Sequence, residues 1–235
     1  MAKKTIRIFL WVTVFAVAMA FLETAVVVYL RKLYYPDGFN FPLKLIGPDI
    51  ALTEFLREIA TLIMLIAVGI FAGRNHTERF AWFIYTFGIW DIFYYVFLVA
   101  LLDWPSSLLT WDLLFLVPVT WVGPVLGPII NSLMMIALAL MIIFFTEKKT
   151  RAKIGKWVWI LLISGSLIVI VSYTEEYTRY MLQQFSLIEI TGFSSTEQVI
   201  TYAGTFIPRH FEWWIYAIGA GMHFAGIFLV WKRNQ

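Results

Sequence analysis

Residues 8–30 read IFLWVTVFAVAMAFLETAVVVYL. This apolar stretch is long enough to cross a lipid bilayer as one α-helix, which needs about 20 residues. Glu23 lies inside it, and an ionisable residue at that depth costs at least about 3 kcal/mol and rarely persists without a role. The stretch therefore indicates a membrane protein with a polar site among its spans.

The composition of the whole chain agrees with this class. Hydrophobic residues make up 61% of the 235 residues, charged residues only 14%, and the mean hydropathy is +0.80. Soluble domains are typically about 45–50% apolar and about 25% charged. With no long polar stretch, we expect residues 1–235 to form a single transmembrane domain. The absence of cysteine excludes disulfides, thiolate catalysis and cysteine-bound metals.

Apolar runs along the chain predict an all-α fold, a polytopic integral membrane bundle of about six transmembrane helices. The predicted spans lie near 8–30, 51–72, 79–102, 123–145, 157–174 and 210–231. An even number of spans places both termini on one side of the membrane. Most basic residues fall on that side, which predicts a cell-membrane protein with cytoplasmic termini. The net charge of +3 reflects this topology, so we expect a lipid bilayer and no nucleic acid as partner.

Three connections on the opposite side carry more structure than simple linkers need. Residues 31–50 contain turn signals and predict a folded-back loop. Prolines recur through 105–128 and break helical hydrogen bonding, which predicts a short interfacial or re-entrant segment near 107–118. Residues 173–209 mix aromatic and charged side chains, and they predict an amphipathic cap at the headgroup level.

Helical periodicity suggests which ionisable residues share a face. Glu54, Arg57 and Glu58 form one stripe near the outer end of the second span. Asp91 is followed at i+3 and i+4 by two tyrosines, and Glu212 falls on the same face as His223 in the last span. We therefore predict an outward-facing buried site. Its expected catalytic residues are Asp91, Glu58, Glu212 and His223; its expected ligand-binding residues are Glu23, Glu54, Arg57, Tyr94, Tyr95, Asp112 and Tyr216.

Structural roles remain open for most of these side chains. The acids around Arg57 can form an interfacial ion-pair cluster, and Asp91 can fasten two helices through a hydrogen bond. His223 can be a core histidine. We assign no metal ligands and no cofactor, although a carboxylate-rich metal site or a single haem with unusual ligation stays an alternative.

Residues 90–95, WDIFYY, resemble the tryptophan–acid–aromatic stretch of small membrane-bound terpene cyclases of meroterpenoid pathways. The resemblance covers these six residues alone, and it implies Asp91 as a proton donor to an isoprenoid double bond or epoxide. The size and the number of spans also look similar to substrate-capturing subunits of vitamin transporters.

The sequence thus predicts a multi-pass membrane protein that binds or processes a lipid-like or isoprenoid small molecule. One alternative is a component of a small-solute or cation transporter. Another is a structural subunit of a larger membrane complex, with membrane partner subunits.

Overall fold

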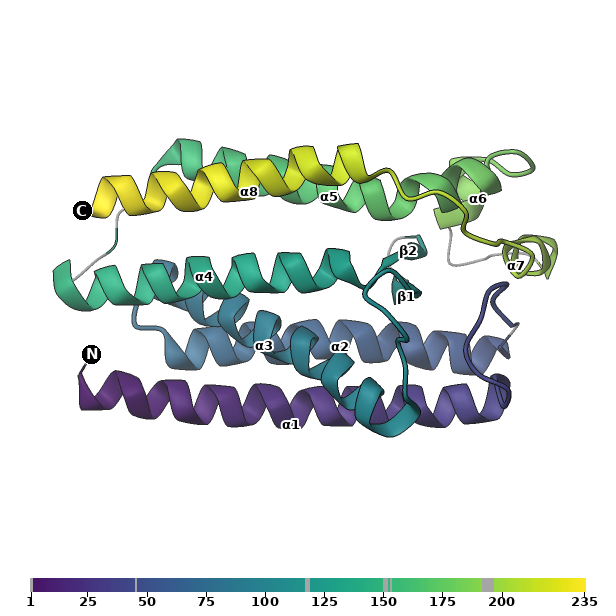
Figure 1. Ribbon diagram of the computed structural model, residues 1–235, viewed down its shortest axis with the longest axis horizontal. Helices are drawn as coiled ribbons and strands as arrows, with labels where there is room; N and C mark the ends of the chain where they lie inside the picture. The colour runs from purple at the N-terminus through teal and green to yellow at the C-terminus, as the bar shows by residue number, and fades with distance from the viewer. Residues whose placement is uncertain (1, 45, 117–118, 150–151, 153, 192–196) are drawn as a thin grey trace.

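Six long helices run side by side along the long axis of the protein (Figure 1), and together they form a multi-pass membrane bundle. The computed structural model describes residues 2–44, 46–116, 119–149, 152, 154–191 and 197–235. The long helices are α1 (Lys3–Tyr34), α2 (Pro48–Ala72), α3 (His76–Leu102), α4 (Leu126–Lys149), α5 (Lys156–Met181) and α8 (Trp213–Asn234). Each is long and apolar enough to cross a membrane, which confirms the predicted fold class.

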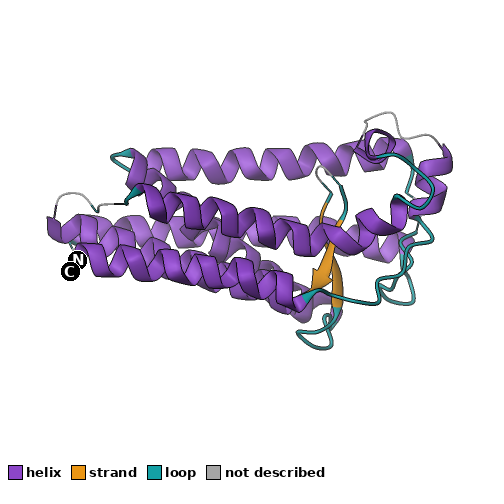
Figure 2. Ribbon diagram, turned by 90° about the horizontal axis from the view of Figure 1, so that it is seen from above, coloured by secondary structure: helices purple, strands orange, loops and turns teal. Residues whose placement is uncertain are grey.

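The two ends of the bundle differ in structure. Both termini lie at one end (Figures 1 and 2). The opposite end carries a two-stranded sheet, β1 (Trp111–Phe115) and β2 (Trp121–Pro124), and two short helices, α6 (Leu187–Thr191) and α7 (Glu197–Ala203). We call it the hairpin end. As an even number of spans requires, the chain starts and finishes on the same side of the bundle.

Helix packing divides the bundle into two groups. Helix α3 contacts α1, α2 and α4, whereas α5 packs on α8, and α8 in turn contacts α4. The α5–α8 contact depends on glycine. A Cβ atom on Gly219 would lie 2.7 Å from the carbonyl oxygen of Gly165, and one on Gly165 would lie 2.9 Å from that of Gly219. Two glycines facing each other thus let the helix backbones approach closely.

Several helices extend beyond the apolar runs that predicted them. Helix α5 continues to Met181 instead of ending near residue 174. An ion pair between Glu175 and Arg179, 2.7 Å long and one turn apart, supports this extra length. Conversely, α4 begins at Leu126 and not near 123, because the preceding residues pair in β2. Hydropathy marks the part of a helix that lipid surrounds, not where its hydrogen bonding stops.

The proline-rich connection folds as a β-hairpin, a strand element that the sequence did not predict. Asp112 pairs with Gly123 and Leu113 with Val122 in antiparallel register. Pro105 and Pro124 lie outside the helices, and Pro128 lies in the first turn of α4. Pro124 stands in a two-stranded sheet, in which each strand is an edge strand and can tolerate a missing N–H. Residues 117–118, the end of the predicted interfacial segment, lie outside the described residues.

The other two connections at the hairpin end differ in regularity. Residues 35–44 and 46–47 form a loop without a helix, as predicted, but the predicted bounds of 31–50 were too wide, because α1 extends to Tyr34 and α2 begins at Pro48. The segment from 182 to 212 contains α6 and α7, and residues 192–196 lie outside the described residues. Its position at the headgroup level of the membrane stays a prediction.

Candidate functional site

A large cavity lies among the six long helices and under the hairpin. Its volume is about 1010 Å³, and we call it the central cavity. Toward the end that carries the termini its wall is mainly apolar and aromatic, and its charged side chains gather toward the hairpin end, among further apolar residues of the hairpin and of α6 and α7. The apolar part includes Phe80, Phe83, Phe87, Trp159, Leu162 and Ile163; the polar part includes Glu23, Arg31, Glu54, Arg57, Glu58, Asp91, Tyr94, Tyr95, Asp112, Asn131, Ser132 and Tyr173. Most residues of the predicted site therefore line one cavity.

Arg57 joins two of the predicted acids across two helices. Its guanidinium forms an ion pair with Glu23 on α1 and another with Glu54, 2.8 Å away on α2. Thr61 donates a further hydrogen bond to Glu23 over 3.3 Å. These ion pairs do not test the predicted roles of the two acids. They show that Arg57 compensates the charges of Glu23 and Glu54 on the cavity wall.

Glu58 is buried one position after Arg57 and has a different partner. Its Oε2 accepts a hydrogen bond from the backbone N–H of Leu116, 3.1 Å away at the end of β1. Within the described residues it has no salt bridge, because Arg57 is engaged by the other two acids. Glu58 therefore ties the hairpin to α2 with a carboxyl group that lacks a cationic partner.

Asp112 is the most buried acid of the site, 1% exposed. Its Oδ1 accepts from Arg31 Nη2 at 3.0 Å and its Oδ2 from the Tyr95 hydroxyl at 3.1 Å. The Arg31 guanidinium also lies between two rings, 3.7 Å from the centroid of Trp104 and 4.3 Å from that of Phe39. Burial raises the pKa of Asp112 to about 6, and the charge of Arg31 opposes that rise.

Asp91 stands near the middle of α3, next to Tyr94 and Tyr95. Ser132 on α4 donates a hydrogen bond to its Oδ2 over 2.7 Å. Like Glu58, Asp91 has no ion pair among the described residues. The rings of the two tyrosines contact each other edge to face, with centroids 5.0 Å apart. The predicted grouping of one acid and two phenols on the cavity wall is thus present.

Tyr216 on α8 anchors a polar cluster with α4 and α5. Its hydroxyl donates toward Asn131 Oδ1 at 3.0 Å, and Asn131 Nδ2 donates to the Tyr173 hydroxyl at 3.0 Å. His223, two turns further along α8, lies 3.1 Å from Ser166 Oγ and 3.2 Å from the carbonyl oxygen of Leu162. His223 lines the central cavity but is held by α5.

Glu212 and His223, predicted from helical spacing to be neighbours on one face, have separate partners. Helix α8 begins at Trp213, so Glu212 is its N-cap position and lies outside the helix. Its carboxylate accepts from Trp214 Nε1 at 2.8 Å and lies 3.8 Å from Arg179. It is absent from the described lining of the central cavity. Periodicity assumes a continuous helix, and the helix starts too late for Glu212.

Arg31, Trp90 and Trp121 line the central cavity although the sequence did not place them in the site. The sequence signal for Arg31 was weak, because eight positions after Glu23 place it about 80° away around α1. The sequence instead placed residue 31 at the start of the predicted loop 31–50. Trp121 had no such signal, since its position depends on the hairpin.

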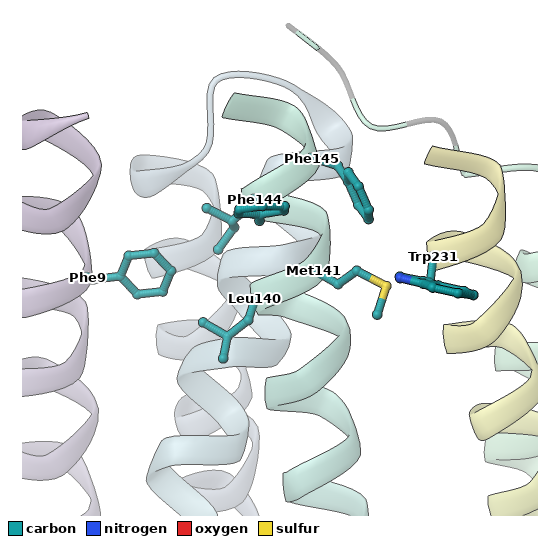
Figure 3. Close-up of a pocket in the computed structure, with 7 residues that line it drawn as sticks. Phe9, Leu140, Met141, Phe144, Phe145 and Trp231 are labelled. Atoms are coloured by element: carbon teal, nitrogen blue, oxygen red, sulfur yellow. The ribbon is translucent and has the colours of Figure 1, made fainter. Parts of the chain in front are cut away.

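A second cavity of about 420 Å³ lies near the end that carries the termini, between α1, α4 and α8 (Figure 3). Its described lining is wholly hydrophobic and aromatic, and contains no ionisable side chain: Phe9, Leu140, Met141, Ile143, Phe144, Phe145 and Trp231. Because it offers no chemistry beyond apolar contact, the central cavity is the better candidate site.

Within the described residues no group of three or more His, Asp or Glu side chains is arranged to hold a metal ion. Comparison with protein families, with curated proteins and with solved structures found no match to this chain. The site therefore has to be interpreted from its own geometry.

Proposed function

We propose that this protein binds or processes a lipid-like or isoprenoid small molecule in the central cavity. The observation that carries this proposal is the division of one cavity of about 1010 Å³ into an apolar, aromatic part and a polar part. Ligand sites of about 300–1,000 Å³ accommodate drug-sized molecules, so this volume suffices for a lipid head with part of its chain. The chain would lie along Phe83, Phe87 and Trp159, and the head near Glu58 and Asp91.

The placement of ionisable residues supports a ligand site over simple helix fastening. Ionisable groups within spans mark functional sites by default because of their cost. Arg57 compensates Glu23 and Glu54, which accounts for those two acids. Glu58 and Asp91 each have only a neutral hydrogen-bond donor among the described residues. If the ligand is processed, Asp91 is the residue that we propose as proton donor.

The test is to purify the full chain in mild detergent and to identify bound lipids by native mass spectrometry and extraction. We expect a lipid to co-purify in stoichiometric amount. A photoreactive isoprenoid analogue added to the protein should crosslink to residues of the central cavity. Phe83→Trp should reduce its occupancy by filling the apolar part, whereas Phe71→Trp, at a position 87% exposed on α2, should not.

Three outcomes would contradict the proposal. A lipid-free preparation, together with a crosslinking yield of the isoprenoid analogue that is the same in Phe83→Trp, would argue against a ligand in the cavity. A stoichiometric partner polypeptide without a ligand would favour a subunit of a larger membrane complex. Uptake of a small solute into vesicles that depends on Asp91 would favour a transporter.

We also propose that the protein resides in the cell membrane with both termini cytoplasmic. Basic residues concentrate near the two termini, and the end of α4, with Lys148 and Lys149, and the start of α5, with Lys156, lie at the same end of the bundle. Cytoplasmic loops carry such an excess of lysine and arginine. The hairpin and the mouth of the polar part would then face outward.

A further inference from the structure

Three buried hydrogen-bond donors on the cavity wall have no acceptor among the described residues. They are Arg31 Nη1, Trp90 Nε1 and Trp121 Nε1. All three residues line the central cavity, and Arg31 is only 7% exposed. A buried donor without an acceptor costs about 1–3 kcal/mol, so such groups call for a partner. The residues that carry these unsatisfied donors thus all form part of the wall that an occupant of the cavity would contact.

The charges on the same wall restrict what that occupant can be. Five acidic residues line the cavity against the lysine and the two arginines described there: Glu23, Glu54, Glu58, Asp91, Asp112, Arg31, Lys44 and Arg57. Two of the acids, Glu58 and Asp91, have no salt bridge within the described part of the chain. An anionic head would bring further negative charge to this wall, and burying an unpaired charge is costly.

A cationic head fits the carboxyl groups but not the donors. An ammonium group could pair with Glu58 or Asp91, yet it offers no acceptor to Trp90 or Trp121, because it carries only N–H donors. A phosphate offers acceptors but adds negative charge. A carbonyl oxygen accepts hydrogen bonds and adds no charge, so it meets both conditions.

We propose that the ligand of the central cavity is a neutral lipid whose head group carries carbonyl oxygens that accept hydrogen bonds from Arg31 and the two tryptophans. This inference rests on the proposed function and narrows it to one ligand class. The planar rings around the donors suit a flat head, since Trp121 stacks on Tyr173 with their planes 18° apart.

The test compares three probes that share one geranylgeranyl chain and differ only in the head. They are a menaquinone, geranylgeranyl diphosphate and geranylgeranylamine. Each competes with a radiolabelled form of the menaquinone for the full chain in lipid nanodiscs. We expect the menaquinone to bind at least about tenfold more tightly than either charged probe.

Donor removal gives a second readout on the same preparation. Trp121→Phe and Trp90→Phe each keep an aromatic ring but delete the N–H, and each should weaken menaquinone binding about three- to tenfold. Trp157→Phe is the control, because Trp157 is 65% exposed on α5 and is absent from the described lining of the central cavity. Thermal unfolding of each variant checks that it is folded.

The outcomes distinguish the proposed head-group chemistry from the proposed binding of a lipid in the central cavity. Tighter binding of the diphosphate or the amine would overturn the neutral carbonyl head and leave lipid binding standing. Unchanged menaquinone affinity in both Trp90→Phe and Trp121→Phe would overturn it as well. Failure of all three probes to bind would overturn both proposals.

Discussion

The buried ion pair between Arg31 and Asp112 is the contact that holds the hairpin against α1. Both side chains are nearly inaccessible, 9% and 2% exposed, and the nitrogen and oxygen atoms are 3.0 Å apart. Removing one partner of a buried pair leaves an uncompensated charge, whereas replacing both by apolar residues is often tolerated. The pair therefore matters more for where the hairpin lies than for net stability.

Asp112→Leu should accordingly lower the free energy of unfolding by about 3–5 kcal/mol. The double variant Arg31→Met with Asp112→Leu should recover most of that loss. Glu175→Ala breaks an ion pair that is largely exposed on its arginine side, and it should cost far less stability than Asp112→Leu. Denaturant titration in mixed micelles measures all three. A double variant as unstable as the single one would show that the pair is not the cause.

The raised pKa of Asp112 predicts a pH dependence of stability. Its pKa rises from 3.8 to about 6 on folding, mainly through burial, so the folded protein binds the proton more tightly than the unfolded chain. The contribution of Asp112 is thus largest below about pH 4 and is lost as pH rises through about 6. Unfolding free energies measured at pH 4 and at pH 7 should differ less in Asp112→Asn than in the unaltered protein. An identical difference in both would contradict the prediction.

At the scale of elements, the α5–α8 contact and the hairpin decide the shape of the central cavity. The close helix pair keeps Tyr173 and His223 facing the cavity from one side, while the hairpin closes its polar end. Open strand edges are tolerated at membrane depth only where protein covers them. Here Glu58 accepts from the N–H of Leu116, and the N–H of Val125 donates to the carbonyl oxygen of Thr110, which continues the pairing of β1 with β2.

Gly219→Ala should separate α5 from α8. The added methyl would lie 2.7 Å from the carbonyl oxygen of Gly165, and backbone cannot move away cheaply, so we expect a loss of about 1–3 kcal/mol in unfolding free energy. Gly221→Ala, in the same helix with no atom within 4 Å of the new Cβ, is the control. It should be neutral or stabilising by up to about 1 kcal/mol. Equal effects at both positions would refute the packing argument.

At the scale of the whole molecule, the arrangement of six spans predicts which residues are accessible from outside the cell. The chain has no cysteine, so a single introduced cysteine reports its own position. Asp37 and Lys4 are both exposed. Asp37 follows the last residue of α1 at the hairpin end, and Lys4 lies in the first turn of α1, at the end that carries the termini.

A membrane-impermeant maleimide should label Asp37→Cys in intact cells. Lys4→Cys should react only after the cells are permeabilised, because its end of the bundle carries the basic residues and should face the cytoplasm. Labelling of Lys4→Cys in intact cells, with Asp37→Cys protected, would reverse the proposed orientation.

The amino-acid sequence alone was enough to predict the helical bundle and most of the charged side chains that line the central cavity. Membrane helices leave a local signal, because each must be apolar over its own length and must satisfy its own backbone. The same locality explains why Glu54, Arg57 and Glu58 were placed on one face, and Asp91 with Tyr94.

The pairing of those side chains required the tertiary structure. Which acid receives Arg57, whether Asp112 meets Arg31, and where Trp121 points depend on helix rotation and on a hairpin that joins distant parts of the chain. Glu212 shows the same limit, since a helix start three residues later than predicted moves it out of the site. Burial and charge compensation arise only when segments far apart in sequence come into contact, and local sequence patterns do not predict such contacts.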